Sequence, residues 1–232
     1  CKPFYNSVVA TFCHQAAHNE PFRIDDPSKE IDFIYIDDII KSFIGCLSSA
    51  PLFDSEGYCR IEPSFRVSLG HLASKLDSFA QLRKTCIMPD FSDAFEKYLY
   101  STYLSYLEKD NFAYAADKKT DSRGYLFELL KTKSSGQFFV SRTLPGITRG
   151  NHWHHTKVEK FCVIEGIAKI ALRNVVSGEK TEYTIEGTES RIVDIPPGWT
   201  HNITNIGSSD LLTIFWANEI FDPSSPDTFY CE

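Results

Sequence analysis

The second half of the chain is a series of short apolar runs, and this pattern constrains the fold more than any other feature. The runs are rich in β-branched and aromatic residues, and examples are QFFVSRT, KFCVIEG, IAKIALRNV, TEYTIEG, RIVDIPPG and DLLTIFWAN. Gly, Pro, Asn and Ser separate them at intervals of roughly ten residues, which is typical of a β-sandwich or a small β-barrel. The turn VSGEK between two of the runs predicts a hairpin.

The first half has a different texture, in which helical patterns alternate with short apolar runs. The run IDFIYI at 31–36 reads as a strand, and SVVATFCHQAAHN has apolar residues at helical spacing. Polar residues stand where helix N-caps belong, namely Asn6 or Ser7, Asp37 with Asp38, Ser68, and Ser92. We therefore predict an α+β chain, with an α/β domain over residues 1–114 and an all-β domain over residues 115–232.

Composition excludes several classes of protein. The formal net charge is −7 and no long basic run occurs, so we expect no nucleic-acid partner. No apolar stretch reaches the length of a membrane span and no signal-peptide pattern is present, so we expect no membrane insertion. The seven cysteines form no CxxC pair, which argues against a disulfide framework and a thiolate zinc site. We predict a reduced, cytoplasmic protein.

Three histidines and one carboxylate in the second half are spaced as metal ligands. His152 and His154 are two residues apart in a predicted strand, so both imidazoles face the same side. Glu159 follows after a gap long enough for a bend, and His201 follows a PPG turn. Such a set suits Zn²⁺, Fe²⁺, Mn²⁺, Ni²⁺ or Cu²⁺ better than Ca²⁺ or Mg²⁺. We predict a divalent metal site with Zn²⁺ as the first choice; the alternative is a strand with solvated histidines.

The same residues form two motifs that resemble those of the cupin family. The first is G-x5-H-x-H-x4-E-x6-G, from Gly146 to Gly166, and the second is P-x-G-x2-H-x3-N, from Pro196 to Asn205. One departure is Ser190, which occupies a position that usually holds glycine. The resemblance implies a jelly-roll barrel, but it does not select a reaction, since cupins include oxygenases, isomerases, epimerases and storage proteins.

Two further segments resemble nucleotide-sugar 3,5-epimerases of the deoxyrhamnose pathway. They are DSRGYLFEL and TRGNHWH. The resemblance implies that Arg123, Glu128 and Arg149 bind the substrate. It also places His152 at the base position of that family, whereas the spacing above assigns His152 to the metal. Trp153 is a further candidate for a wall of the sugar pocket, although aromatic residues in β-sandwiches more often belong to the core.

Over almost its whole length the chain resembles bifunctional capsular polysaccharide synthesis enzymes of the CapF type, also called the WbjC type. The segment around DFIYIDD resembles the C-terminal part of an extended short-chain dehydrogenase/reductase (SDR), and the cupin motifs follow it. The resemblance implies a UDP-linked 4-keto-6-deoxy-N-acetylhexosamine as substrate. The cupin part would invert C3, and the reductase part would reduce the C4 ketone with NADPH, on the way to N-acetyl-L-fucosamine. The resemblance to metal cupins, which commonly pair through their sheets, also implies a homodimer through the cupin sheet.

Part of the reductase pattern does not occur in this sequence. There is no glycine-rich dinucleotide fingerprint and no YxxxK pair. The chain begins with Cys1, and its only methionine is Met88. We therefore interpret the chain as the C-terminal part of a longer protein, and we expect NADPH to bind only the full-length form.

Epimerisation needs an acid and a base on opposite faces of the sugar. His155 lies at the opposite parity to His152 and His154, which predicts a position at the mouth of the site. We take His155 and Lys157 as the candidate acid and base, ahead of Lys160 and tyrosines such as Tyr183. Two alternatives stay open for the same ligand set: a cupin-type Fe(II) dioxygenase, and a non-catalytic module that binds nucleotide sugars.

Overall fold

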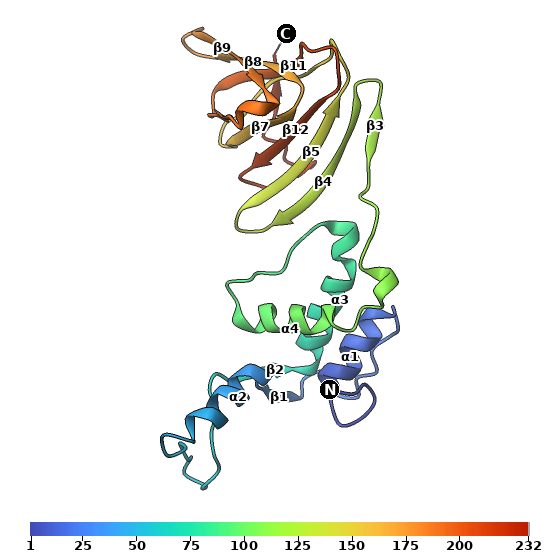
Figure 1. Cartoon of the computed structure of the whole chain (residues 1–232), viewed down its shortest axis with the longest axis vertical. Helices are drawn as coiled ribbons and strands as arrows, with labels where there is room; N and C mark the ends of the chain where they lie inside the picture. The colour runs from blue at the N-terminus through green and yellow to red at the C-terminus, as the bar shows by residue number, and fades with distance from the viewer. Residues whose placement is uncertain (232) are drawn as a thin grey trace. The chain divides into compact units, whose positions relative to one another are not determined.

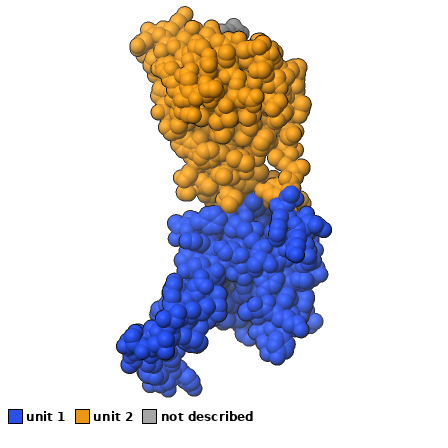
Figure 2. Space-filling model, viewed as in Figure 1, with its two compact units in different colours: residues 1–82, 89–113 blue, residues 83–88, 114–232 orange. Residues whose placement is uncertain are grey.

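The computed structural model describes residues 1–231, which form two compact units (Figure 2). Unit 1 comprises residues 1–82 and 89–113, and unit 2 comprises residues 83–88 and the chain from residue 114 onward. The division differs from the predicted boundary after residue 114 in the short segment 83–88. A parallel bridge between Ile87 and Lys131 joins this segment to unit 2.

Unit 1 consists of helices and one small two-stranded sheet. Its elements are α1 (Val8–Ala17), β1 (Glu30–Phe33), α2 (Ile36–Gly45), β2 (Phe65–Ser68), α3 (Leu69–Thr85), α4 (Ala94–Leu104) and the short 3₁₀ helix η1 (Lys109–Asn111). Its core combines residues of α1, α3 and α4, among them Phe12, Leu72, Leu76 and Leu99. The predicted mixture of helices and short strands is present. The relation of this unit to short-chain reductases stays a prediction.

Two of the predicted helix starts are confirmed by side-chain caps. The Ser7 hydroxyl accepts a hydrogen bond from the Ala10 N–H at 3.2 Å, and Ser7 is the N-cap of α1. The Ser68 hydroxyl accepts one from the His71 N–H at 3.2 Å at the start of α3. Both hydroxyls satisfy a backbone donor that the first helical turn leaves without an intrahelical partner.

Two other helix starts differ from the prediction. Asp93, rather than Ser92, caps α4, because its carboxylate accepts from two backbone N–H groups while Ser92 bonds to Asp90. Tyr35 precedes α2 and provides no side-chain cap. Asp37 and Asp38 therefore both lie in the first turn, where their charge interacts favourably with the helix dipole.

Unit 2 is a cupin-like β domain built from two antiparallel sheets (Figure 1). The six-stranded sheet has the order β10-β7-β12-β5-β4-β3, and the five-stranded sheet has the order β13-β6-β11-β8-β9. The strands are β3 (Lys119–Asp121), β4 (Gly124–Thr132), β5 (Gly136–Thr143), β6 (Thr148–Trp153), β7 (Glu159–Glu165), β8 (Ile167–Asn174), β9 (Lys180–Glu186), β10 (Ile192–Ile195), β11 (Trp199–Asn205), β12 (Leu211–Ala217) and β13 (Phe229–Tyr230). Each of the six apolar runs identified in the sequence overlaps one of these strands, and β8 and β9 form the predicted hairpin.

The core of unit 2 lies between the sheets, because alternate residues of each strand point inward. In β8, Ala168, Ile170 and Leu172 are buried, and the residues between them are more exposed. Phe161 of β7 and Phe215 of β12 meet this layer from the other sheet. The apolar residues whose alternation predicted a β-sandwich are therefore the ones that fill its interior.

Ser190, the departure from the second cupin motif, lies between the short 3₁₀ helix η2 (Gly187–Glu189) and β10. Its φ of 52° is in the left-handed region. This conformation favours glycine, which explains why the resembling family places glycine here.

The longest helix, α3, has 17 residues. Among residues 1–231, no helix combines the length and the apolar character that crossing a bilayer requires.

Candidate metal centre

The four predicted ligands lie on three strands and one connection. His152 is in β6, His154 directly follows β6, Glu159 begins β7, and His201 is in β11. The bend after His154 carries the chain across to the six-stranded sheet, while β6 and β11 belong to the five-stranded sheet. The cluster therefore draws side chains from both layers of the domain.

The approach of β6 to β11 depends on Gly150. His152 and His201 are partners in the register of the two strands, and a bulge follows between His201 and Asn202. Gly150 has a φ of 103°, and a Cβ atom at this position would lie 2.7 Å from the His201 carbonyl oxygen. Only glycine fits here without displacing the strand, so Gly150 allows the two histidines to lie close together.

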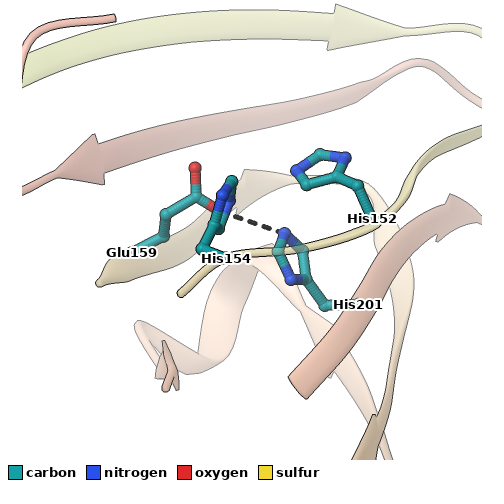
Figure 3. A group of neighbouring side chains, drawn as sticks. All are labelled: His152, His154, Glu159 and His201. Carbon is teal, nitrogen blue, oxygen red and sulfur yellow. Dashed lines mark ion pairs between the residues drawn. The ribbon is translucent and has the colours of Figure 1, made fainter. Parts of the chain in front are cut away.

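The four side chains gather in the interior of the domain (Figure 3). His201 Nε2 lies 3.0 Å from Glu159 Oε2, and His154 Nε2 lies 3.4 Å from the same oxygen. One potential ligand atom from each of the four residues lies within 4.8 Å of the others. His154, Glu159 and His201 are 3%, 8% and 1% exposed, so water reaches these three poorly.

The buried atoms at the centre of the cluster lack partners. Nε2 of His154, Nε2 of His201 and Oε2 of Glu159 are buried, and none makes a hydrogen bond of suitable geometry. Leaving such groups unsatisfied is costly. A tetrahedral ion with ligands at about 2.0–2.1 Å separates its ligand atoms by roughly 3.3 Å, which is close to the contacts above. The residues therefore fit a divalent ion, and in the described chain they are the one group that does.

The protonation states of two of the four residues, Glu159 and His152, agree with a ligand set. Burial opposes the charge on Glu159, but contacts with His154 and His201 outweigh it and lower the pKa of Glu159 to about 2. Burial and the neighbouring His201 lower the pKa of His152 to about 4. Near neutral pH the cluster thus offers a carboxylate and a neutral imidazole, which are the forms that bind metals. For His154, burial lowers the pKa, but contacts with Glu159 and Asp227 outweigh it and raise that pKa.

Backbone carbonyls orient two of the imidazoles. The Nδ1–H of His154 donates to the Asp227 carbonyl, and His201 Nδ1 lies 3.2 Å from the Trp199 carbonyl. A carbonyl can only accept, so these contacts place the proton on Nδ1 and leave Nε2 free to face Glu159. Sequence reasoning missed Asp227, because it lies 73 residues from His154 and belongs to no recognised motif.

A cavity of about 200 Å³ opens onto His152, Glu159 and His201. Arg123, Arg149 and Ser141 also line it, together with the apolar side chains of Leu126, Phe139, Phe161, Ile203 and Phe215. A larger hollow of about 700 Å³ lies in unit 1, but apolar and aromatic side chains dominate its lining, which includes no His, Asp or Glu among the described residues. The cavity of unit 2 therefore has the chemistry of a site, and the larger hollow does not.

The two arginines of the cavity are held differently. Arg149 Nε donates to Thr143 Oγ1 at 3.0 Å, while its buried Nη2 has no hydrogen-bond partner. Arg123 Nε donates to Asp121 at 2.9 Å, and this contact lowers the pKa of the Asp121 carboxyl. Burial, together with the charge of Arg123, lowers the pKa of Arg149. Arg149 Nη2 also lies 4.0 Å from Asp121 Oδ1, which is an ion pair but not a hydrogen bond. Arg149 is therefore a largely buried cation that can still donate a hydrogen bond from Nη2 to an anionic or carbonyl group.

Five predicted site residues do not line the cavity, namely the candidate ligand His154 and four others. Glu128 pairs with Lys131 at 2.8 Å, and Trp153 packs against Phe229 at 4.8 Å between ring centroids. His155 is exposed, and Lys157 is 5% exposed with its Nζ 3.6 Å from Glu219. Strand β6 ends at Trp153, so His155 and Lys157 lie in the connection that follows it, and neither is among the residues that line the cavity. Their role as acid and base stays a prediction.

Comparison with known proteins shows close relatives over the whole chain. Residues 119–229 match the family described as Polysaccharide biosynthesis C-terminal domain. The chain is 42% identical to UDP-2-acetamido-2,6-beta-L-arabino-hexul-4-ose reductase of Pseudomonas aeruginosa, over 99% of this chain and 61% of that protein. It is 44% identical to the capsular polysaccharide assembling protein CapF of Staphylococcus aureus, with a TM-score of 0.91 over all of this chain and 67% of that one.

A solved structure of CapF with the inhibitor 3-isopropenyl-tropolone gives the same identity of 44% and a TM-score of 0.93, again over all of this chain and 67% of the other. The chain thus spans about two thirds of the length of these relatives, from 61% to 67%. Because the likeness covers every part of the chain and both its sequence and its fold, the chain belongs to the family of capsular polysaccharide biosynthesis proteins of the CapF type.

Proposed function

We propose that this chain carries the C3-epimerase centre of a CapF-type enzyme. Its substrate is a UDP-linked 4-keto-6-deoxy-N-acetylhexosamine, and its product serves the synthesis of N-acetyl-L-fucosamine for a capsular polysaccharide. One observation carries the proposal: three histidines and a glutamate form a largely buried cluster, and three of these residues, His152, Glu159 and His201, line a cavity together with two arginines. The name of the Pseudomonas relative describes an enzyme for a UDP-linked 4-ketohexose, which supports this class of substrate.

Inversion at C3 requires loss of the proton next to the C4 carbonyl and its return to the other face, and the barrier is the negative charge that develops on the keto oxygen. A divalent ion bound by His152, His154, Glu159 and His201 would act as a Lewis acid toward that oxygen. The ligands themselves set the charge of the site. One carboxylate and three neutral imidazoles leave a divalent site with a formal charge of about +1, which favours an anionic oxygen.

The arginines would bind the other end of the substrate, its diphosphate. Guanidinium groups bind phosphate oxygens through paired hydrogen bonds. Arg149 Nη2 makes no hydrogen bond and lies in a long ion pair, 4.0 Å from Asp121, so it can still donate one to the substrate. The cavity of about 200 Å³ is smaller than the roughly 300–1,000 Å³ typical of pockets for drug-sized ligands. We infer that the sugar ring enters it, while Arg123 and Arg149 hold the diphosphate nearer the rim.

The remaining wall of the cavity is apolar. Phe139, Phe161 and Phe215 pack together, with ring centroids 5.1 Å apart for the first and third and 4.6 Å apart for the second and third. Such a wall excludes water from the sugar. A dry environment strengthens the interaction of the developing charge with the cationic groups that face it.

Incubation with the UDP-linked 4-keto sugar in D₂O tests the proposal directly. We expect deuterium at C3 without oxygen consumption, loss of exchange after chelation, and recovery when Zn²⁺ is added. Oxygen consumption would instead indicate a dioxygenase. Binding of the sugar nucleotide without exchange or oxygen uptake would indicate a module that only binds nucleotide sugars.

Two finer features belong to the same proposal. We expect Zn²⁺ as the native ion, since the histidine-rich set with one carboxylate is typical of zinc, and metal analysis of protein purified without added metal tests this. We also expect a homodimer through the cupin sheet, as the resemblance to metal cupins implies. Light scattering at micromolar concentration measures it, and a monomer would remove this part of the proposal.

A further inference from the structure

His154 differs from the other candidate ligands in how its backbone is held. His152, Glu159 and His201 lie within strands, where ladder hydrogen bonds fix the main chain. His154 follows the last residue of β6, and the chain does not pair again until Glu159. One contact to its backbone comes from the Gly198 N–H, which donates to the His154 carbonyl at 2.8 Å. Further hydrogen bonds must therefore fix the side chain of His154 and the turn that follows it.

The C-terminal segment provides that support through Asp227. The Asp227 carboxylate accepts hydrogen bonds from the backbone N–H groups of His155, Thr156 and Lys157, at 2.8, 2.8 and 2.9 Å. The Thr156 hydroxyl donates a fourth at 3.0 Å. The Asp227 carbonyl meanwhile accepts from Nδ1 of His154. A single residue thus fixes both the ring of His154 and the turn that follows it.

Pairing of β13 with β6 holds Asp227 in place. Phe229 pairs with Trp153, and Tyr230 pairs with His152. The Cys231 N–H donates to the Asn151 carbonyl at 3.0 Å, which extends the pairing. Asp227 lies two residues before this strand, so its position relative to β6 is set by the strand register rather than by a free loop.

We propose that Asp227 is a positioning residue that presets His154 for metal binding, so that the C-terminal segment 218–231 is part of the metal centre. The proposal rests on the metal site proposed above. It makes the affinity for the ion depend on a residue that touches neither the ion nor the substrate. Partners of this kind typically change metal affinity 10- to 100-fold when they are removed.

The test compares Asp227→Ala with Asp222→Ala in the full chain. Asp222 is a matched control, because it also accepts hydrogen bonds within the C-terminal segment, from Ser224, but makes no contact with the ligands. Each protein is stripped of metal and titrated with Zn²⁺ against a competing chelator, and the absorption spectrum of the Co²⁺ form is recorded. We expect Asp227→Ala to bind Zn²⁺ about 10- to 100-fold more weakly and to shift the Co²⁺ bands, with Asp222→Ala like wild type.

Thr156→Val provides a milder variant in case Asp227→Ala does not fold. It removes one of the four bonds to the carboxylate, and we expect a loss of affinity between about two- and tenfold. Wild-type affinity in both Asp227→Ala and Thr156→Val would overturn the proposal, as would equal weakening in Asp227→Ala and Asp222→Ala. Wild-type protein that binds neither Zn²⁺ nor Co²⁺ would overturn it together with the proposed metal site, whereas wild-type binding without deuterium exchange would reject only the proposed reaction.

Discussion

Each unit contains a cluster in which histidine rings meet a glutamate, and the comparison of the two is instructive. In unit 1, the rings of His14 and His18 lie 4.0 Å apart, and His18 Nε2 lies 3.4 Å from Glu108 Oε1. In unit 2, two histidine nitrogens lie 3.0 and 3.4 Å from Glu159. The distances in the two clusters are similar, so proximity alone does not distinguish them.

Burial and hydrogen bonding separate the clusters. In unit 1, His18 Nδ1 donates to the His14 carbonyl at 2.8 Å, and the Glu108 side chain is 69% exposed. Water and the backbone therefore satisfy that cluster. In unit 2 the facing atoms of His154, Glu159 and His201 are buried and have no hydrogen-bond partner. The first is a surface ion pair of small energetic value, and the second has the ligand types and the spacing that could hold a divalent ion.

Glu159→Gln should lower the affinity for metal more than any other variant, whereas the equivalent change in the cluster of unit 1 should not lower it. The change removes the one negative ligand and leaves the charge of a bound divalent ion without compensation in a buried site. Removing one partner of a buried charged set costs about 3–5 kcal/mol, or roughly 100- to 5,000-fold in affinity. We expect Zn²⁺ binding and C3 deuterium exchange to be lost together. Glu108→Gln is the matched control, and a metal affinity that falls equally in both variants would refute the assignment.

Chelation of the metal should destabilise one unit and leave the other unchanged. An ion present at 1,000 times its dissociation constant stabilises the folded form by about 4 kcal/mol. After treatment with a chelator, amides of β6, β7 and β11 should exchange with D₂O much faster, while amides of α1 and α4 keep their protection. Region-resolved hydrogen exchange by mass spectrometry measures this. Uniform loss of protection in both units would contradict a metal site confined to unit 2.

The strand pattern and the pair of histidines two residues apart were sufficient to predict the β domain and to single out the four candidate ligands. The reason is that alternation along a strand is a local property, so His152 and its neighbours reveal their face directly. Gly150 is part of the same local signal, since the family motif and the steric need for a residue without Cβ coincide. Whether the four residues bind a metal stays a prediction.

Sequence reasoning failed where a residue depends on distant parts of the chain. Parity predicted that His155 lies at the mouth of the site, but β6 ends at Trp153, so the alternation on which that prediction rests does not extend to His155. Lys157 is buried against Glu219, a partner that no local pattern identifies. Asp227 was missed for the same reason, because its role exists only once β13 has paired with β6.

Arg149→Lys tests whether this side of the cavity binds the anionic part of the substrate, and it leaves the candidate metal ligands unchanged. Lysine keeps the charge but loses the second nitrogen and the Nε contact with Thr143. Hydrogen bonds to charged groups contribute about 1.5–3 kcal/mol, so we expect KM to rise roughly 10- to 150-fold with Zn²⁺ affinity unchanged. Arg142→Lys is the matched control, since Arg142 pairs with Asp210 at 3.1 Å and does not line the cavity. An unchanged KM in Arg149→Lys would remove the residue from substrate binding.

His18→Gln should have the smallest effect of these variants. It should change the stability of the folded protein, and the change should depend on pH and not on bound metal. The hydrogen bond to His14, followed by the contact with Glu108, raises the pKa of His18 above its ordinary 6.5. Protonated His18 therefore adds stability below pH 6.5, and this contribution is lost as the pH rises through the raised pKa. Melting of metal-free protein at about pH 5.5 and about pH 8.5 should differ from wild type only at the lower pH, by less than about 0.5 kcal/mol. A fall in Zn²⁺ affinity in this variant would contradict the distinction between the two clusters, because it would show that the exposed histidines of unit 1 also contribute to metal binding.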